Sequence, residues 1–261
     1  VGDLHGDFAN SLSVFRMAGV IDADNHWAGG NHTVLVQTGD IVDRGHDTIL
    51  LYELMQRLKT EAARAGGRVV QLLGNHELMN MAEDLRFVSA EDYASFGGPE
   101  PRRQAFSQLG SIGKRLFKLH LVHRVGDTVF THGGITEEWA ARGVRMTNRD
   151  TTRELPPYVA EKDIYRRYYG WPIFGDSGPA WYRGYAMEAE ASICRSLYRA
   201  LRKMKVKRMV VGHTWQESGR ILSRCSNRFF VIDVGISAVY GGYQGALEIE
   251  SNGRVTALYP D

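Results

Sequence analysis

Apolar residues in the first half of the chain alternate between strand-like and helix-like spacing. Short β-branched runs at residues 33–36 and 68–73 predict buried strands. Between them, residues 48–65 carry apolar side chains three or four positions apart, which predicts a helix that Asp47 can cap. A further helix is predicted at about residues 8–18. Strands that alternate with helices in this way favour parallel pairing.

The second half of the chain shows a different pattern. Apolar runs predict further strands at residues 129–130, 209–211, 229–232, 246–249 and 254–259. Several of these runs are separated by turn signals and not by helices, so we expect a more antiparallel sheet. The chain as a whole is predicted to be an α/β protein, with a two-sheet β-sandwich of mixed strands flanked by helices.

Two stretches do not follow the strand–helix rhythm. Residues from about 80 to 121 look mostly helical, and residues from about 143 to 184 are rich in tyrosine and tryptophan. The aromatic stretch can be ordinary packing of an excursion or a surface for substrate. We therefore expect one catalytic domain over residues 1–261, with insertions at about 80–121 and 143–184.

Composition excludes several classes of protein. The net charge of +2 is too small to indicate a nucleic-acid partner. No apolar stretch approaches 18 residues, so no membrane span is expected. Two cysteines, Cys194 and Cys225, are too few for a disulfide framework, are expected to be structural and favour a reducing compartment, so the default location is intracellular and cytoplasmic. Val1 directly precedes a candidate site residue, so we expect a fragment of a longer protein, whose upstream part can carry a targeting segment.

Five short motifs rich in glycine and polar residues carry the candidate chemistry, and most of them follow an apolar run. They are Gly2–Gly6, Gly39–Gly45, Gly74–Glu77, His132–Gly134 and Gly212–Thr214. In open α/β sheets, functional groups gather on loops beyond the carboxyl ends of the strands. Glycine lets such loops turn sharply and lets the backbone approach a ligand closely.

Carboxylates, one amide and imidazoles in these motifs form the ligand set of a site for two divalent ions, in which one carboxylate bridges. The predicted ligands are Asp3, His5, Asp40, Asn75, His132 and His213. Asp40 is the best bridge: one ion takes Asp3, His5 and Asp40, and the other takes Asp40, Asn75, His132 and His213. Ligands without thiolate suit manganese, iron, zinc or cobalt; we expect manganese in vitro, with iron or zinc as alternatives.

The remaining motif residues are predicted to act on the substrate. Asp43 can hold His76 in one tautomer, so that His76 protonates the departing oxygen. Arg44 offers a planar fork for phosphate oxygens, and Arg183 is the candidate for a second arginine, with a surface ion pair as its alternative role. Asn75 is expected to contact the phosphate as well as a metal ion.

These motifs resemble the phosphoprotein phosphatase family of calcineurin-like binuclear metallophosphoesterases. The resemblance covers Gly2 to about Gly235. It implies a central β-sandwich, direct attack by a hydroxide that bridges the two metal ions, and no phosphoenzyme. It also assigns the six ligands, Arg44 and the His76–Asp43 pair the same roles as those inferred above from residue types.

Further details look similar to the Shewanella-like branch of this family. They include the sequence from Leu73 to Asn80, the sequence from Asp84 to Val88 and the Trp-Tyr-Arg-Gly-Tyr sequence at 181–185. One departure from the main serine/threonine phosphatases is also present. Their Ser-Ala-Pro-Asn-Tyr segment is missing, and this chain reads Val-Gly-Ile-Ser-Ala-Val-Tyr at 234–240.

The predicted function is hydrolysis of phosphomonoesters in a phosphoprotein or phosphopeptide, with phosphotyrosine and phosphoserine/threonine both open. The alternative is a hydrolase of dinucleotide polyphosphates such as diadenosine tetraphosphate, but Asp43 and Glu77 favour the phosphatase. A non-catalytic binding module would lack a ligand, and none is missing from the motifs. A nuclease is not favoured, because the sequence shows no extended basic groove with interleaved aromatic residues.

Overall fold

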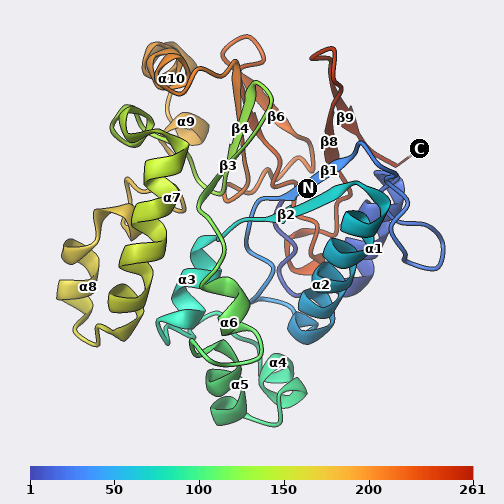
Figure 1. Ribbon diagram of the computed structural model, residues 1–261, viewed down its shortest axis with the longest axis vertical. Coiled ribbons are helices and arrows are strands. Elements are labelled where there is room, and N and C mark those ends of the chain that lie inside the picture. Colours follow the sequence, from blue (N-terminus) through green and yellow to red (C-terminus); the bar gives the residue numbers. More distant parts are fainter. Residues whose placement is uncertain (261) are drawn as a thin grey trace.

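The computed structural model describes residues 1–260 as strands surrounded by helices (Figure 1). Asp261, the last residue of the predicted domain, lies outside them. The strands are β1 (Val34–Gln37), β2 (Arg68–Gln71), β3 (Val122–Val125), β4 (Thr128–Thr131), β5 (Arg208–Val211), β6 (Leu222–Arg224), β7 (Phe229–Val231), β8 (Ala246–Ile249) and β9 (Val255–Leu258). The α-helices are α1 (Phe8–Met17), α2 (Thr48–Ala65), α3 (Asn75–Met81), α4 (Ala90–Ser95), α5 (Pro99–Phe106), α6 (Gly113–Leu116), α7 (Glu137–Ala160), α8 (Ile164–Gly170), α9 (Gly184–Met187) and α10 (Glu190–Met204).

The first half of the fold follows the sequence pattern closely. β1 and β2 pair in parallel, and α2 connects them with the predicted bounds. Leu51, Leu54 and Leu58 on α2 are buried, as the helical spacing requires. The predicted role of Asp47 is wrong in one respect. Its carboxylate accepts no bond from α2 and instead accepts the backbone N–H of Phe8 at 3.1 Å, at the start of α1.

The second half contains a five-stranded sheet in the order β3-β4-β5-β7-β6. Its three central strands β4, β5 and β7 are parallel, and only the edge strands β3 and β6 are antiparallel. The expected antiparallel character is therefore wrong for the centre of this sheet. Helices α7 to α10 lie between β4 and β5 in the chain and supply the long crossover that parallel pairing needs. The final hairpin, β8 with β9, packs its apolar side chains near Val210 and Phe230.

The two stretches that broke the rhythm have separate structures. Residues 80–121 hold the short helices α4, α5 and α6, which extend away from the sheets in Figure 1. Residues 143–184 belong mainly to α7 and α8, and α7 is kinked at Gly143, where φ is 75°. Its aromatic residues divide between two environments, because Tyr158 is buried whereas Tyr165 on α8 is 74% exposed.

The two cysteines form a disulfide between α10 and the turn after β6, with their Cα atoms 5.4 Å apart. A structural role for both cysteines agrees with the expectation from the sequence. The bond removes the basis of the argument for a reducing compartment, because that argument treated the cysteines as unpaired. Among residues 1–260, no helix is both long enough and apolar enough to cross a membrane.

Candidate metal centre

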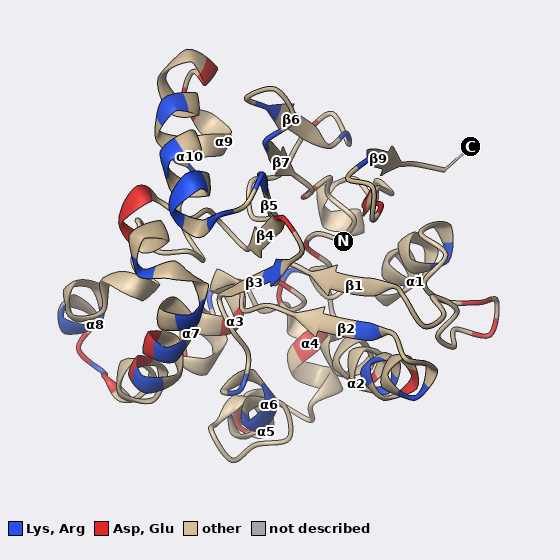
Figure 2. Cartoon of the chain, turned by 45° about the horizontal axis from the view of Figure 1, so that its top comes forward, with Lys and Arg blue, Asp and Glu red and all other residues tan. Residues whose placement is uncertain are grey.

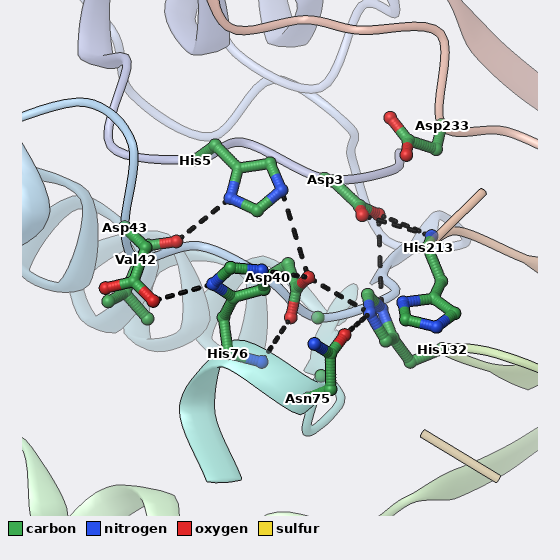
Figure 3. Close-up of polar contacts among 12 residues, drawn as sticks. Asp3, His5, Asp40, Val42, Asp43, Asn75, His76, His132, His213 and Asp233 are labelled. Carbon is green, nitrogen blue, oxygen red and sulfur yellow. Dashed lines mark hydrogen bonds and ion pairs between the residues drawn. The ribbon is translucent and has the colours of Figure 1, made fainter. Parts of the chain in front are cut away.

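The loops that follow the strands bring the predicted site residues into one buried cluster (Figure 3). Asp40 follows β1, Asn75 follows β2, His132 follows β4 and His213 follows β5. Parallel pairing sends the loops after β1 and β2 to one edge of their sheet and the loops after β4 and β5 to one edge of the other sheet. The two edges meet at the cluster, where the ring of His132 contacts both Asn75 and Asp40. Each residue of this cluster is at most 6% exposed: Asp3, His5, Asp40, Asp43, Asn75, His76, His132 and His213.

Asp40 lies at the centre of the cluster. Its Oδ2 is 3.1 Å from Nε2 of His132, 3.8 Å from Nε2 of His5 and 3.9 Å from Nε2 of His76. Its Oδ1 accepts the backbone N–H of His76 at 2.9 Å. Burial by itself would raise the pKa of Asp40, but the surrounding imidazoles, His132 first, hold it well below its ordinary value. Asp40 is therefore a carboxylate within reach of several nitrogen donors.

Glu77 fixes the loop that presents Asp40. Its carboxylate accepts the backbone N–H groups of Asp40, Ile41 and Gly74, each at 2.8 Å. Glu77 is fully buried, and the hydroxyl of Tyr52 also donates to it at 3.2 Å. From the sequence, Glu77 served only to separate two enzyme classes. In the structure it also joins the backbone of the second motif to that of the third.

The three imidazoles have defined tautomers. Nδ1 of His5 faces the carbonyl of Val42 at 3.0 Å, and Nδ1 of His132 faces the carbonyl of Thr38 at 2.9 Å. Nε2 of His213 faces the carbonyl of Trp181 at 3.1 Å. A carbonyl only accepts, so each of these nitrogens carries a proton. The other ring nitrogen keeps its lone pair in His5 and His213, whereas Nε2 of His132 faces two further acceptors, Oδ2 of Asp40 and Oδ1 of Asn75.

Burial also keeps two of these rings uncharged. It lowers the pKa of His5 to about 4 and lowers the pKa of His213 well below its ordinary value. Neutral imidazole is the form that binds metal ions. The structure therefore presents lone pairs from His5 and His213 without the need to remove a proton first.

Several residues of the cluster have strained backbone conformations. The φ angles of His5, Asp40, Asp43, Arg44 and His213 lie between 41° and 72°, the left-handed region that residues with a side chain rarely adopt. Such strain concentrates at functional sites, where it fixes the direction of a side chain. The loop backbone therefore fixes the direction in which each of these side chains points.

Glycines of the motifs are required by close contacts with the carboxylates. A Cβ atom at Gly212 would lie 2.1 Å from Oδ1 of Asp3, and one at Gly74 would lie 2.0 Å from Oδ1 of Asp40. Both distances are far shorter than any real contact, so only glycine fits. Through these glycines the backbone of one motif contacts the carboxylate of another.

A second acidic group lies beside Asp40. Asp3 accepts the backbone N–H of His213 at 3.0 Å and 3.2 Å, and burial, followed by the charge of Asp233, raises its pKa well above the ordinary value. Burial likewise raises the pKa of Asp233 to about 6. Asp233 was not among the residues predicted from the sequence. It follows β7 directly, so its position at a strand end was a signal that could have identified it.

The donor atoms fall into two overlapping groups that share Asp40. One group contains His5, Asp40 and His76, and the other contains Asp40, His132 and His213; within each group the donor atoms lie within 4.8 Å of one another. Oδ1 of Asn75 lies 2.9 Å from Nε2 of His132, next to the second group. Buried oxygen and nitrogen donors around a shared carboxylate fit the requirements of divalent ions.

His76 differs from the other histidines of the cluster. Its Nδ1 donates to Oδ2 of Asp43 at 2.6 Å, and Asp43 is fully buried. Burial disfavours the charged ring, but Asp40 and Asp43 raise its pKa above the ordinary value overall. His76 is therefore the histidine of this centre that is prepared to carry an extra proton.

The two predicted phosphate-binding arginines have different surroundings. The guanidinium of Arg44 lies 4.0 Å from the ring centre of Phe87, and its buried Nε has no hydrogen-bond partner among the described residues. Arg183 donates instead to the backbone carbonyl of His213 and to Oγ1 of Thr214. Its predicted alternative role, a surface ion pair, is not found among residues 1–260. Arg183 braces the loop that carries His213.

Aromatic side chains border the centre. The ring of Tyr240 lies 5.1 Å from that of His5 and 5.3 Å from that of Trp215, while the ring of Phe87 lies 5.1 Å from that of His76. Tyr240 belongs to the segment at 234–240 that departs from the main serine/threonine phosphatases. That segment therefore forms part of the border of the centre.

Comparison with known proteins gives this geometry its context. The model of the family described as calcineurin-like phosphoesterase matches residues 1–217, which is most of the chain. The chain belongs to this family. The predicted α/β fold with mixed sheets and flanking helices is confirmed, and the protein is a metal-dependent phosphoesterase that uses divalent metal ions.

The relatives of this phosphoesterase include Shewanella-like protein phosphatase 2 of Arabidopsis thaliana, which is 32% identical and is matched over 98% of this chain and 75% of its own length. An uncharacterized protein of Schizosaccharomyces pombe is 39% identical, over 97% of this chain and 76% of its own. The solved structure of a cold-active protein tyrosine phosphatase is 31% identical and superposes with a TM-score of 0.83, over 99% of this chain and 75% of that chain. The resemblance to Shewanella-like phosphatases is confirmed, and the chain is a metal-dependent phosphatase.

Proposed function

We propose that this phosphatase hydrolyses phosphomonoesters of proteins with the help of two divalent ions. The ligands would be Asp3, His5, Asp40, Asn75, His132 and His213. Ions bound there supply positive charge for the phosphoryl oxygens and lower the pKa of water toward neutrality. The observation that carries the proposal is the position of Asp40, which is shared by two groups of donor atoms and lies beside the His76–Asp43 pair.

The surrounding residues have separate tasks. His76 donates a proton to the departing oxygen, and Asp43 keeps its Nδ1 occupied so that Nε2 faces the centre. Arg44 binds phosphate oxygens, which is supported by its buried Nε without a protein partner and by the ring of Phe87 beneath it. Arg183 contacts the phosphate less directly, because part of its guanidinium is already used by the His213 loop.

The substrate is proposed to be a phosphotyrosine residue in preference to phosphoserine or phosphothreonine. The rings of Tyr240 and Trp215 border the centre and offer flat apolar surfaces to the ring of a tyrosine. The likeness to a solved cold-active protein tyrosine phosphatase supports the same preference. Serine and threonine esters would leave these faces without a partner.

A turnover assay with added manganese tests both parts of the proposal. The substrates are a phosphotyrosine peptide, the same peptide with phosphothreonine, and diadenosine tetraphosphate. We expect the phosphotyrosine peptide to have the highest kcat/KM and the dinucleotide to stay intact. Equal or faster turnover of the phosphothreonine peptide would refute the preference for tyrosine, and cleavage of the dinucleotide alone would refute the phosphoprotein assignment.

A further inference from the structure

A buried group of polar residues lies behind the His76–Asp43 pair, on the side away from Asp40. It consists of Asn80 at the end of α3, Asp92 on α4 and Arg102 on α5, and we call it the Arg102 cluster. Arg102 and Asp92 are fully buried, and Asn80 is 2% exposed. A buried arginine requires a specific reason, because removing its charge from water is strongly unfavourable unless the charge is paired.

The Arg102 cluster is connected to Asp43 by short contacts. Nδ2 of Asn80 donates to both carboxylate oxygens of Asp43, each at 2.9 Å. Nη1 of Arg102 donates to Oδ1 of Asn80 at 2.6 Å, and its Nη2 lies 3.6 Å from Oδ1 of Asp43. Asp43 thus accepts a hydrogen bond from His76 on one side and contacts the Arg102 cluster on the other.

The chemistry of the donors fixes the orientation of Asn80. Asp43 as a carboxylate only accepts, so it selects the NH₂ end of the Asn80 amide. Arg102 only donates, so it selects the oxygen end. Nδ2 of Asn80 also donates to the backbone carbonyl of His76 at 2.8 Å, so acceptors hold the NH₂ end of the amide and Arg102 holds its oxygen end. If Arg102 were absent, the buried Oδ1 of Asn80 would lose its donor, and the amide would be held at one end only.

Arg102 is itself held in place. Nε donates to Oδ2 of Asp92 at 2.8 Å, and the guanidinium lies 4.7 Å from the ring centre of Phe106 and 5.5 Å from that of Phe96. A planar guanidinium between a carboxylate and aromatic faces has little freedom to rotate. Helices α4 and α5 therefore fix the guanidinium of Arg102. Arg102 positions the amide of Asn80, and Asn80 positions Asp43. Asp43 in turn positions the ring of His76.

We propose that Arg102 is a positioning residue for proton transfer to the leaving group, acting through Asn80 and Asp43 on the ring of His76. This inference rests on the proposed role of His76 as the proton donor. It also gives the helical stretch at residues 80–121, which broke the rhythm of the sequence, a task in the reaction. Arg102 touches neither the substrate nor the metal ligands, so its effect must appear in the chemistry of the leaving group and not in metal or phosphate binding.

The test compares Arg102→Lys with Arg103→Lys. Lysine keeps the charge of residue 102, but a single ammonium cannot contact Asp92, Asn80 and Asp43 together as the guanidinium does. Arg103 is the adjacent residue on α5, but it is 43% exposed at its side chain and pairs with Glu100, so the same substitution there is a matched control. Asp92→Asn, which keeps the volume of the side chain, serves as the second variant if Arg102→Lys does not fold.

The measurement is kcat and KM for aryl phosphates whose leaving oxygens range from weakly to strongly basic. A proton donor matters most for strongly basic leaving groups. We expect Arg102→Lys to lower kcat for phenyl phosphate by about 10- to 100-fold and to leave 2,4-dinitrophenyl phosphate nearly unchanged, with KM, bound manganese and inhibition by inorganic phosphate unaltered. Asp92→Asn should act in the same direction with a smaller effect, and Arg103→Lys should match the wild type.

His76→Asn, measured in parallel, separates the two proposals. If His76→Asn slows phenyl phosphate selectively while Arg102→Lys and Asp92→Asn slow all substrates equally or none, the inference about Arg102 is wrong and the role of His76 stands. If His76→Asn itself slows all substrates equally, His76 is not the proton donor. Its proposed role and the inference about Arg102 are then both refuted, whereas the hydrolysis of phosphomonoesters at the metal centre is not.

Discussion

Two parts of this molecule bury charged side chains completely, and they treat those charges in opposite ways. At the metal centre, Asp3, Asp40 and Asp233 lie close together. Imidazoles contact Asp3 and Asp40, but no lysine or arginine among residues 1–260 forms an ion pair with any of the three. In the Arg102 cluster, one guanidinium lies 2.8 Å from Asp92 and 3.6 Å from Asp43. Figure 3 shows the first group together with Asp43, the residue that connects the two.

The difference indicates which of the two groups binds a ligand. Buried charge without a partner is unfavourable, so a fold retains it where a ligand supplies the missing charge. Buried charges that pair with each other hold side chains in place, and no ligand is needed to supply a compensating charge. Figure 2 shows that many of the basic residues of the chain lie on helices such as α10 and α8.

The largest effect is expected for Asp40→Asn, which removes the carboxylate shared by both groups of donors. We expect turnover of a phosphopeptide with manganese to fall by at least ~10³-fold, because the shared ligand positions both ions. The control is Asp24→Asn at an exposed aspartate, which should leave turnover unchanged. Turnover of Asp40→Asn within a few-fold of the wild type would show that the centre is not where the chemistry occurs.

A smaller effect, on stability, is expected for Arg102→Met. This change leaves Asp43 and Asp92 buried without their cation, so the free energy of unfolding should fall by about 3–5 kcal/mol in urea, with or without manganese. Arg103→Met, at an exposed position, should cost less than about 1 kcal/mol. If the loss of stability in Arg102→Met disappeared when manganese is added, the Arg102 cluster and the metal centre would not be independent of each other.

The smallest effect, with the opposite sign, is expected for Asp233→Asn in protein freed of metal by a chelator. Burial raises the pKa of Asp233 from 3.8 to about 6, so the folded state binds this proton more tightly than the unfolded state. The stability from this group is complete below the ordinary pKa and is lost as the pH rises through about 6. The variant avoids that loss, so above pH 6 it should be more stable than the wild type by on the order of 2–3 kcal/mol.

Asp150→Asn is the matched control for that experiment. Asp150 is equally buried, but Arg153 pairs with it at 2.9 Å, so its carboxylate is balanced. Asparagine there should lower stability and not raise it. Urea unfolding of both variants from pH 4 to pH 8 provides the measurement. If Asp233→Asn lost as much stability as Asp150→Asn, the carboxylate of Asp233 would not be an uncompensated charge.

The residues of the metal centre could be predicted from the sequence, whereas those of the Arg102 cluster could not, for a physical reason. Asp40, His132 and His213 each follow an apolar strand and sit beside a glycine, so a few neighbouring residues carry the signal. The polar residues of the Arg102 cluster occupy short helices, where polar side chains are usually exposed, and nothing local distinguishes them from surface positions. Asp233 lacked a recognised motif, although it too follows a strand.

The sequence by itself determined the first parallel pair of strands, the bounds of α2, the strand-end motifs and the family to which they belong, because these depend on short-range periodicity and local backbone geometry. Only the tertiary structure decided the parallel centre of the second sheet, the redirected cap at Asp47, the Cys194–Cys225 bond and the contact of Arg102 with Asp43. Each of these depends on which distant segments meet. These contacts are set by the packing of whole helices and strands, and the sequence around each residue does not indicate its distant partner.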